Sequence, residues 1–218
     1  MTVRVFAALA LMMVGAAFAE PANDAFAHPA TAAALRESLL APITRDLARA
    51  TVLTGNFTQR RLLHEIPRPL VSKGDFLLAR ELGVQWRTRE PFDSELVLTR
   101  SGMTMRADSA ETVEFSTRNQ PAVRAAAEIV FALFALDLET LEHRFLLFAA
   151  GTPEQWQIGL RPRDAVTASV FRQAVISGSR QVERVVLEDA AGDRTEVHLS
   201  DVAVRSAPLS ASERAHFD

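Results

Sequence analysis

The stretch from Gly55 to Met105 constrains the fold more than any other part of the chain. Its apolar residues come in short runs, and glycine or proline separates the runs at Pro67, Pro69, Gly74, Gly83, Pro91 and Gly102. Short runs bounded in this way are typical of consecutive antiparallel strands. Because side chains alternate along a strand, Val84 and Trp86 share one face, and Gln85 and Arg87 share the other. The stretch therefore predicts a curved sheet with a polar face and an apolar inner face that needs a cover.

Residues 1–19 have the pattern of a secretory signal peptide. A positively charged start is followed by an apolar run from Val5 to Ala17, which is too short to span a membrane. The small residues of Ala17-Phe18-Ala19 fit a cleavage site, so we expect cleavage after Ala19. The competing interpretation is a buried N-terminal helix. The mature chain, 20–218, has the length of one domain, and the sequence predicts that it is exported to the periplasm.

Composition excludes several classes of protein. A net charge of -3 and a pI near 6.0 give no basic surface of the kind that binds nucleic acid. The chain has no cysteine, which removes disulfides, thiol catalysis and thiolate metal sites. Since Glu20 stands where a bacterial lipoprotein has its cysteine, an acyl anchor on this chain is not expected either.

The segment from Pro29 to Arg49 is predicted to be helical. Its larger aliphatic residues recur every four positions and form one apolar stripe, made of Leu35, Leu39, Ile43 and Leu47. Thr31 suits the N-cap, because its hydroxyl can accept a hydrogen bond from a backbone N–H of the first turn. Pro42 interrupts the pattern and predicts a kink or two shorter helices.

Strands are expected to follow at residues 56–65, 70–79, 84–88, 95–99, 103–107 and 112–117. Their short connections favour a meander in which neighbours in the sequence pair with each other. Pro121 then suits the start of a helix whose middle, Ile129 to Leu136, is apolar on every side. Such a helix is buried on several sides or covers an apolar surface. Asp137 and Glu139 are expected to end it and to begin a second short helix.

The remainder of the chain is predicted to be mainly strands. They are expected at residues 144–150, 156–161 and 170–177, and in a hairpin made of 181–189 and 194–204. The turn Ala190-Ala191-Gly192-Asp193 is the clearest turn signal in the chain. After Pro208 the tail is polar, and only a helical turn is expected near Ser210 to Ala215.

Nothing in the sequence indicates catalysis. The five histidines do not stand at metal-ligand spacing with one another or with carboxylates. A nucleophile elbow, a glycine-rich phosphate loop and a dinucleotide-binding motif are all missing from the sequence. We therefore predict that the protein is not an enzyme, and the sequence indicates neither a metal nor a cofactor.

Large apolar residues, in contrast, are plentiful in the predicted sheet and central helix. An ordinary packed core accounts for any single one of them. The alternative is a cavity between the curved sheet and a helical cover, and phenylalanine and methionine suit a lining that repacks around a flexible guest. The residues expected to line this cavity are Phe76, Leu78, Val84, Trp86, Leu96, Leu98, Ile129, Phe131, Leu133 and Phe134.

A set of residues in the first predicted strands stands in a recognisable order. The set is Phe57-Thr58-Gln59, Gly74-Asp75-Phe76, Arg80, Trp86, Pro91 and Leu96-Val97. This order resembles the N-terminal half of the outer-membrane lipoprotein carrier (LolA-like) family, and the signal peptide and alanine-rich central helices also fit. The resemblance implies an α+β fold, namely an unclosed, strongly curved antiparallel β-barrel with helices covering its mouth.

The same resemblance implies roles for single residues. Trp86 and Leu96 match inner-face positions of the family. Arg80 matches an arginine that latches the lid, donating to backbone carbonyls of the cover helix when the carrier is empty. Two features depart from the family pattern. Glu81 replaces the usual proline and could pair with Arg80, and the tail after Pro208 is short.

The function implied by the resemblance is transport without chemistry. A periplasmic carrier would bind the acyl chains of a lipoprotein or related lipid in its cavity and move it from the inner to the outer membrane. Its partners would be an inner-membrane release complex or exporter and an outer-membrane acceptor, and it would act as a monomer. The alternatives are a periplasmic lipid-binding sensor or accessory module on the same fold, and an enzyme on lipid-like substrates. A missing second domain and a missing nucleophile–base pair argue against these two.

Overall fold

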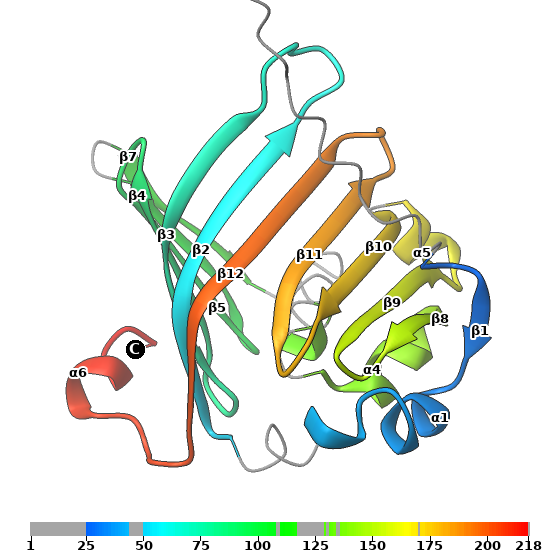
Figure 1. The fold of residues 1–218 in the computed structure, drawn as a ribbon. Helices are drawn as coiled ribbons and strands as arrows, with labels where there is room; N and C mark the ends of the chain where they lie inside the picture. Colours follow the sequence, from blue (N-terminus) through cyan, green and yellow to red (C-terminus); the bar gives the residue numbers. More distant parts are fainter. Residues whose placement is uncertain are drawn as a thin grey trace, which may run out of the picture.

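The computed structural model describes residues 25–43, 50–107, 110–116, 129, 131–133, 136–169 and 171–217, with 110–116 described by the backbone alone. The predicted signal peptide, its cleavage site and most of the predicted central helix lie outside these residues. The described residues have an α+β fold, in which one antiparallel sheet bends strongly without closing (Figure 1). No helix among them has the length and apolar character needed to cross a membrane.

The first half of the sheet is a meander. Its strands are β2 (Val52–Leu62), β3 (Leu70–Ala79), β4 (Gly83–Glu90), β5 (Ser94–Thr99), β6 (Gly102–Ala107) and β7 (Ala110–Ser116). Each strand pairs with the next, which confirms the predicted topology. The strand predicted at 70–79 is correct at both ends. β2 starts at Val52 and not at residue 56, so Gly55 lies inside the strand.

The second half of the sheet is built in the same way. Its strands are β8 (Phe145–Thr152), β9 (Gln155–Pro162), β10 (Phe171–Gly178), β11 (Val182–Asp189) and β12 (Arg194–Arg205). The predicted turn between the last two is confirmed. The Asp189 carboxylate accepts hydrogen bonds from the N–H groups of Ala191 and Asp193 at 2.9 and 3.0 Å. Gly192 has a φ of 91°, a left-handed conformation that favours glycine.

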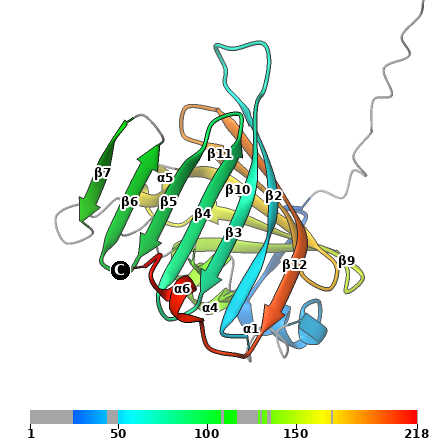
Figure 2. The same cartoon turned by 90° about the vertical axis from the view of Figure 1, so that its left-hand side faces the viewer.

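The two halves are joined by β12 and β2, which lie side by side along nearly their whole length (Figures 1 and 2). The register runs from Arg194 opposite Leu62 to Arg205 opposite Val52, with a bulge between Ser200 and Ala203. A bulge bends its strand and increases the local twist, which helps the sheet to curve here. The described strands have the order β1-β8-β9-β10-β11-β12-β2-β3-β4-β5-β6-β7, so β1 and β7 are the two edges.

The helix predicted from Pro29 is shorter than expected. Residues His28–Ala30 form β1, which pairs with β8 at the edge of the sheet, so this part of the prediction is wrong. The edge of β8 offers backbone groups that hydrogen-bond with these residues, and this pairing favours an extended conformation over a helix. Thr31 is the N-cap, as predicted, and its hydroxyl accepts from Ala34 N–H at 3.2 Å. Helix α1 then spans Ala32–Glu37 and ends before Pro42, in agreement with two shorter helices.

The other helices are short and capped by side chains. Asp137 caps α4 (Leu138–Arg144), which confirms the predicted second helix. Asp164 caps α5 (Ala165–Ala168), a turn that was not predicted from the sequence. Ser210 caps α6 (Ala211–Arg214) as part of a capping box with Glu213, which confirms the predicted turn in the tail.

The main hydrophobic core fills the concave side of the sheet. It includes residues of α1, α4 and the strands β8 to β10, and among these Trp156, Ile158, Leu160 and Ile176 are completely buried. A smaller cluster lies on the convex side of β3. There Val52, Leu77 and Ala79 are covered by Leu209 and Phe217 of the tail that carries α6 (Figure 2). The convex face is therefore not polar throughout.

Candidate functional site

Two rows of residues cross the concave face of the meander, with one residue from each of the strands β2 to β6. The Trp86 row consists of Gly55, Phe76, Trp86, Leu96 and Met105. The Val84 row consists of Leu53, Leu78, Val84, Leu98 and Met103. All six sheet residues that the sequence predicted for the cavity lie in these two rows. Neither row contains an ionisable side chain, so this face can select a ligand by apolar contact and shape.

The rows differ in how far they are covered. The Val84 row is buried from Leu53 to Leu98, and only Met103 at its end is partly exposed. In the Trp86 row, exposure increases from Phe76 on β3 to Met105 on β6. Phe76 is 3% exposed, Trp86 and Leu96 are partly exposed, and Met105 is 42% exposed. The concave face thus presents an apolar surface that opens from β4 toward β6.

Three aromatic rings hold the inner end of the Trp86 row. The rings of Phe57 and Trp86 are stacked, with centroids 3.8 Å apart and planes inclined by 22°. The ring of Phe76 lies 6.1 Å from that of Trp86 at an inclination of 23°. Stacked aromatic pairs of this kind contribute more stability than their buried area alone would give. The indole of Trp86 is therefore fixed by Phe57 on one side while part of it stays accessible.

Two glycines make this aromatic packing possible. Gly74 lies opposite Phe57, and Gly55 lies opposite Phe76. A Cβ atom at Gly74 would come within 1.9 Å of the carbonyl oxygen of Arg87 and 2.9 Å of the Phe57 ring. A Cβ atom at Gly55 would come within 2.8 Å of the Phe76 ring. Both rings therefore lie against the sheet where a side chain would otherwise stand.

The helical residues predicted for the cavity are only partly described. Ile129 and Leu133 are 4% and 6% exposed and belong to the same core as the two rows, and Phe131 is partly buried against it. Phe134 lies outside the described residues. After Leu133 the chain turns at Leu136, which has a φ of 47°, and Asp137 N–H donates to the Ala132 carbonyl at 2.9 Å. The structure thus brings three of the four helical residues to the concave face.

The other half of the concave face is closed by helices. Arg36 of α1 and Glu139 of α4 form an ion pair at 3.0 Å, and Ala32 N–H donates to the Glu142 carboxylate at 3.2 Å. Beneath them the inward-facing side chains of β9 and β10, such as Ile158, Leu160 and Ile176, are fully buried. We therefore place the candidate ligand surface on the Trp86 row and not on β8 to β10.

Arg80 lies in the turn between β3 and β4. Its backbone N–H donates to the Thr51 carbonyl at 3.0 Å, and its Nε donates to the Ala50 carbonyl at 3.1 Å. These bonds tie the turn to the residues that precede β2. The predicted latch requires bonds to the cover helix, most of which lies outside the described residues, so the latch stays a prediction. Glu81 is exposed.

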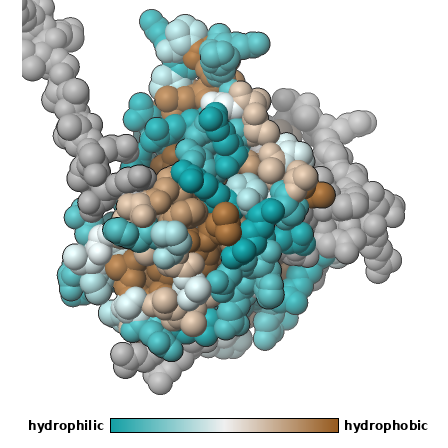
Figure 3. All heavy atoms as spheres, turned by 90° about the vertical axis from the view of Figure 1, so that its right-hand side faces the viewer, coloured by the Kyte–Doolittle hydropathy of each residue, from teal (hydrophilic) through white to brown (hydrophobic). Residues whose placement is uncertain are grey.

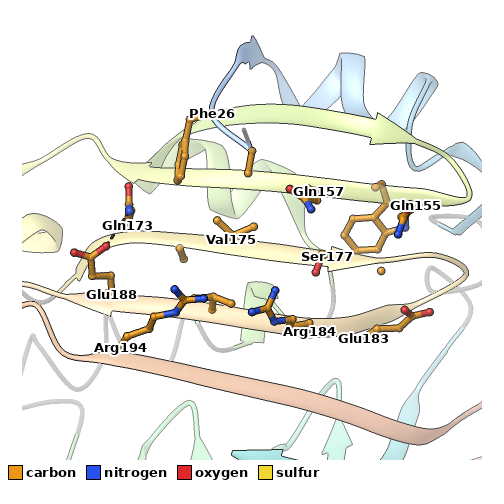
Figure 4. A pocket seen from close by; sticks show the side chains of 15 residues that line it. Phe26, Gln155, Gln157, Gln173, Val175, Ser177, Glu183, Arg184, Glu188 and Arg194 are labelled. Carbon is orange, nitrogen blue, oxygen red and sulfur yellow. Dashed lines mark hydrogen bonds between the residues drawn. The ribbon is translucent and has the colours of Figure 1, made fainter. Parts of the chain in front are cut away.

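A hollow lies on the convex face, and its character differs from that of the apolar concave surface. Its volume is about 450 Å³, and it crosses β9, β10, β11 and the start of β12 (Figure 4). Figure 4 shows the hydrogen bond from Gln173 to Glu188, which measures 2.9 Å. Arg194 and Arg184 both pair with the Glu196 carboxylate, at 2.7 and 3.5 Å. The lining mixes apolar residues with two arginines and two glutamates, so it suits an acyl chain less well than the Trp86 row does.

The sequence prediction missed part of the concave surface. Met103 and Met105 extend the two rows, and Phe57 completes the aromatic stack, but none of the three was among the predicted lining residues. Alternation could have identified the methionines. Met103 and Met105 share one face of their strand, and pairing with residues 95–99 puts that face beside Leu96 and Leu98. Phe57 could not be placed without knowing that Gly74 lies opposite it.

Comparisons with known proteins agree with this architecture. The family model described as "Outer membrane lipoprotein carrier protein LolA" matches residues 48–212. No curated protein sequence matches the chain.

Solved structures resemble the chain at low sequence identity. A LolA superfamily protein from Nitrosomonas europaea is 10% identical, with 83% of this chain and 97% of that chain covered and a TM-score of 0.44. A DUF1329 family protein from Desulfovibrio piger is 8% identical, with 83% and 99% covered and a TM-score of 0.45. The Pseudomonas aeruginosa MucA/MucB complex gives 12% identity, with 80% and 58% covered and a TM-score of 0.42.

Proposed function

The chain belongs to the outer membrane lipoprotein carrier protein LolA family, and from this premise we propose that it is a periplasmic carrier of acylated cargo. It binds the acyl chains of a lipoprotein or a related lipid on the concave face of its sheet. It moves this cargo from the inner to the outer membrane, between a release complex or exporter and an acceptor. The mature protein, 20–218, acts as a single domain.

The observation that carries the proposal is the graded exposure of the Trp86 row. An apolar row that is covered at Phe76 and open at Met105 offers contact to an acyl chain that enters from the β6 side. A soluble protein gains nothing in stability from leaving such a surface uncovered, so its exposure favours a binding role. The absence of ionisable groups in the row suits a hydrocarbon ligand.

The strength of this binding follows from hydrocarbon transfer. Each methylene moved out of water contributes about 0.8 kcal/mol, so a chain of about sixteen carbons that is half sheltered gains about 6 kcal/mol. This binding free energy is enough to keep the cargo on the carrier in water. Transfer to an acceptor that binds the cargo more tightly still lowers the free energy. A latch at Arg80 would stabilise the empty carrier by a few hydrogen bonds, each contributing about 1 kcal/mol, and would thereby oppose cargo binding.

Mass spectrometry of the protein purified from cells under non-denaturing conditions tests the proposal. The expected result is a population of molecules that carry extra mass, identified after extraction as acylated lipid or lipoprotein. Met105→Asp should reduce that population strongly, because a charge would stand in the open end of the row. Leu146→Asp is the matched control, since Leu146 is also 42% exposed but lies on the outer face of β8.

Two outcomes would contradict the proposal. One is a purified protein that never carries acylated molecules and does not bind a fluorescent fatty acid. The other is equal loss of bound lipid in Met105→Asp and Leu146→Asp. A protein that binds lipid but does not pass it to acceptor membranes would instead support the sensor or accessory module.

A further inference from the structure

The hairpin that joins β2 to β3 projects from one end of the sheet. Figures 1 and 2 show it reaching beyond the neighbouring turns of the molecule. We define the hairpin tip as residues 60–71, which include the last residues of β2, the connecting loop and the start of β3. Every residue of the tip except Leu63 is exposed. The cargo surface proposed above does not involve the tip.

The hairpin tip is unusually apolar for an exposed element. Leu62, Ile66, Leu70 and Val71 are 39%, 42%, 51% and 45% exposed. Phe92, in the turn after β4, is 81% exposed. This turn lies at the same end of the sheet as the tip, since Glu90 of β4 pairs with Lys73 near the start of β3. Figure 3 shows brown residues among teal ones at the top of the molecule, where the tip projects. Apolar side chains gathered at a projecting tip indicate a contact surface.

The charged residues of the tip are mainly basic. Arg60, Arg61 and Arg68 stand beside one carboxylate, Glu65, although the whole chain has a net charge of -3. Arg61 also lies 4.0 Å from the Asp193 carboxylate, and half of its side chain remains exposed. The tip is thus a basic and apolar element on an acidic protein. Basic residues next to exposed apolar ones are the combination that binds anionic lipid surfaces.

The backbone of the tip argues against a partner protein that adds a strand. Pro67 and Pro69 have no N–H group to donate, so this part of the loop cannot form a regular ladder with another chain. Ile66 N–H donates to the Leu63 carbonyl at 3.1 Å within the loop itself. Side chains, and not backbone groups, are what the tip offers to a partner.

We propose that the hairpin tip docks the protein on the surface of an anionic lipid bilayer. Ile66 and Leu70 enter the boundary between headgroups and acyl chains, and the arginines contact the lipid phosphates. Docking by the tip requires no cargo, so it is separable from lipid carriage. It would hold the carrier at a membrane while the concave face exchanges its ligand.

Vesicle flotation tests the proposal. The protein is recovered from the soluble fraction of cells, and its N-terminal residue is determined by mass spectrometry. The probes are vesicles of phosphatidylethanolamine with phosphatidylglycerol, compared with vesicles of phosphatidylcholine alone. We expect binding to the anionic vesicles that weakens as salt is raised. Ile66→Asp should lower the partition coefficient by about tenfold or more, and Arg68→Ala by about fivefold.

Val166→Asp is the matched control, because Val166 is 61% exposed on α5 and lies outside the tip. It should leave vesicle binding unchanged. An Ile66→Trp variant gives a direct readout, since its fluorescence should shift to the blue and be quenched by brominated lipid. The proposal is overturned if anionic vesicles do not bind, if Ile66→Asp binds as well as the parent, or if Ile66 mediates self-association without vesicles. Loss of cargo binding in Met105→Asp with vesicle docking retained would separate the two proposals.

Discussion

Phe57 and Trp86 stack with their ring centroids 3.8 Å apart, although the two residues come from strands separated by β3. The contact is possible because β3 places Gly74, and not a side chain, between them. It orients the Trp86 indole so that one side packs on the protein and the rest stays accessible to a ligand.

Trp86→Ala should weaken binding of a fluorescent fatty acid by about tenfold, because an indole buries more apolar area than any other side chain. The same change should lower the free energy of unfolding by about 2–3 kcal/mol, less than for a fully buried tryptophan. Phe92→Ala is the control, since Phe92 is 81% exposed and outside the row. Fatty-acid titration and urea unfolding check both effects, and unchanged affinity in Trp86→Ala would remove the residue from the site.

Gly74→Ala should destabilise the protein by more than about 3 kcal/mol, since its Cβ would overlap the carbonyl oxygen of Arg87. Gly192→Ala is the comparison, because nothing lies within 4 Å of a Cβ there and only the φ of 91° opposes it. That strain costs about 1 kcal/mol. Thermal unfolding of the two variants should rank them in this order. Equal losses would show that the Phe57–Gly74 pairing is not tight.

Arg80→Leu should slow release of cargo to acceptor vesicles if the arginine latches the cover helix. It should also lower the free energy of unfolding by about 1 kcal/mol, because the Nε bond to the Ala50 carbonyl is lost. Arg214→Leu on the exposed tail helix is the control for removing a positive charge. Transfer of a fluorescent lipid measures the first effect. A variant that loses stability but releases cargo at the parent rate would assign Arg80 a structural role only.

Docking of the C-terminal tail should weaken in acid. The pKa of the Glu213 carboxyl lies below its ordinary value of 4.5, because Ser210 donates to it from its N–H and its hydroxyl and Arg205 pairs with it. A lowered pKa stabilises the folded tail fully above about pH 4.5 and loses that contribution as the pH falls through the folded value.

Hydrogen exchange of the tail amides measures this effect. Exchange protection around Phe217 should fall below pH 4.5 in the parent protein, relative to protection in the sheet. Glu213→Gln should show the weaker docking already at neutral pH. Glu65→Gln, at an exposed carboxylate of the hairpin tip and far from the tail helix in the fold (Figure 1), should behave like the parent. Exchange protection of the tail that does not change with pH would contradict the role assigned to Glu213.

Local signals explain which parts of the fold could be predicted from the sequence. Thr31 and Asp137 cap helices because their side chains reach backbone N–H groups three residues on, a pattern visible in the sequence. The meander follows from glycine and proline between short apolar runs. The inner face follows from alternation, so the sheet residues predicted for the cavity lie together in two rows on that face.

The rest depends on contacts between distant residues. β1 is only three residues long and exists because the β8 edge is available to it, more than a hundred residues later in the chain. Gln85 was expected on a polar face, yet it is only 7% exposed and donates to Glu95. Which row stays open also depends on where the helices pack, which alternation does not specify.

The pairing of β12 with β2 fixes the order of events when this chain matures. One long side of β2 has unpaired backbone groups until residues 194–205 are made, more than a hundred residues later in the chain. The chain must therefore be made as far as β12 before the sheet is complete. A chain truncated before β12 would keep the unpaired edge of β2, and such an edge favours aggregation and proteolysis.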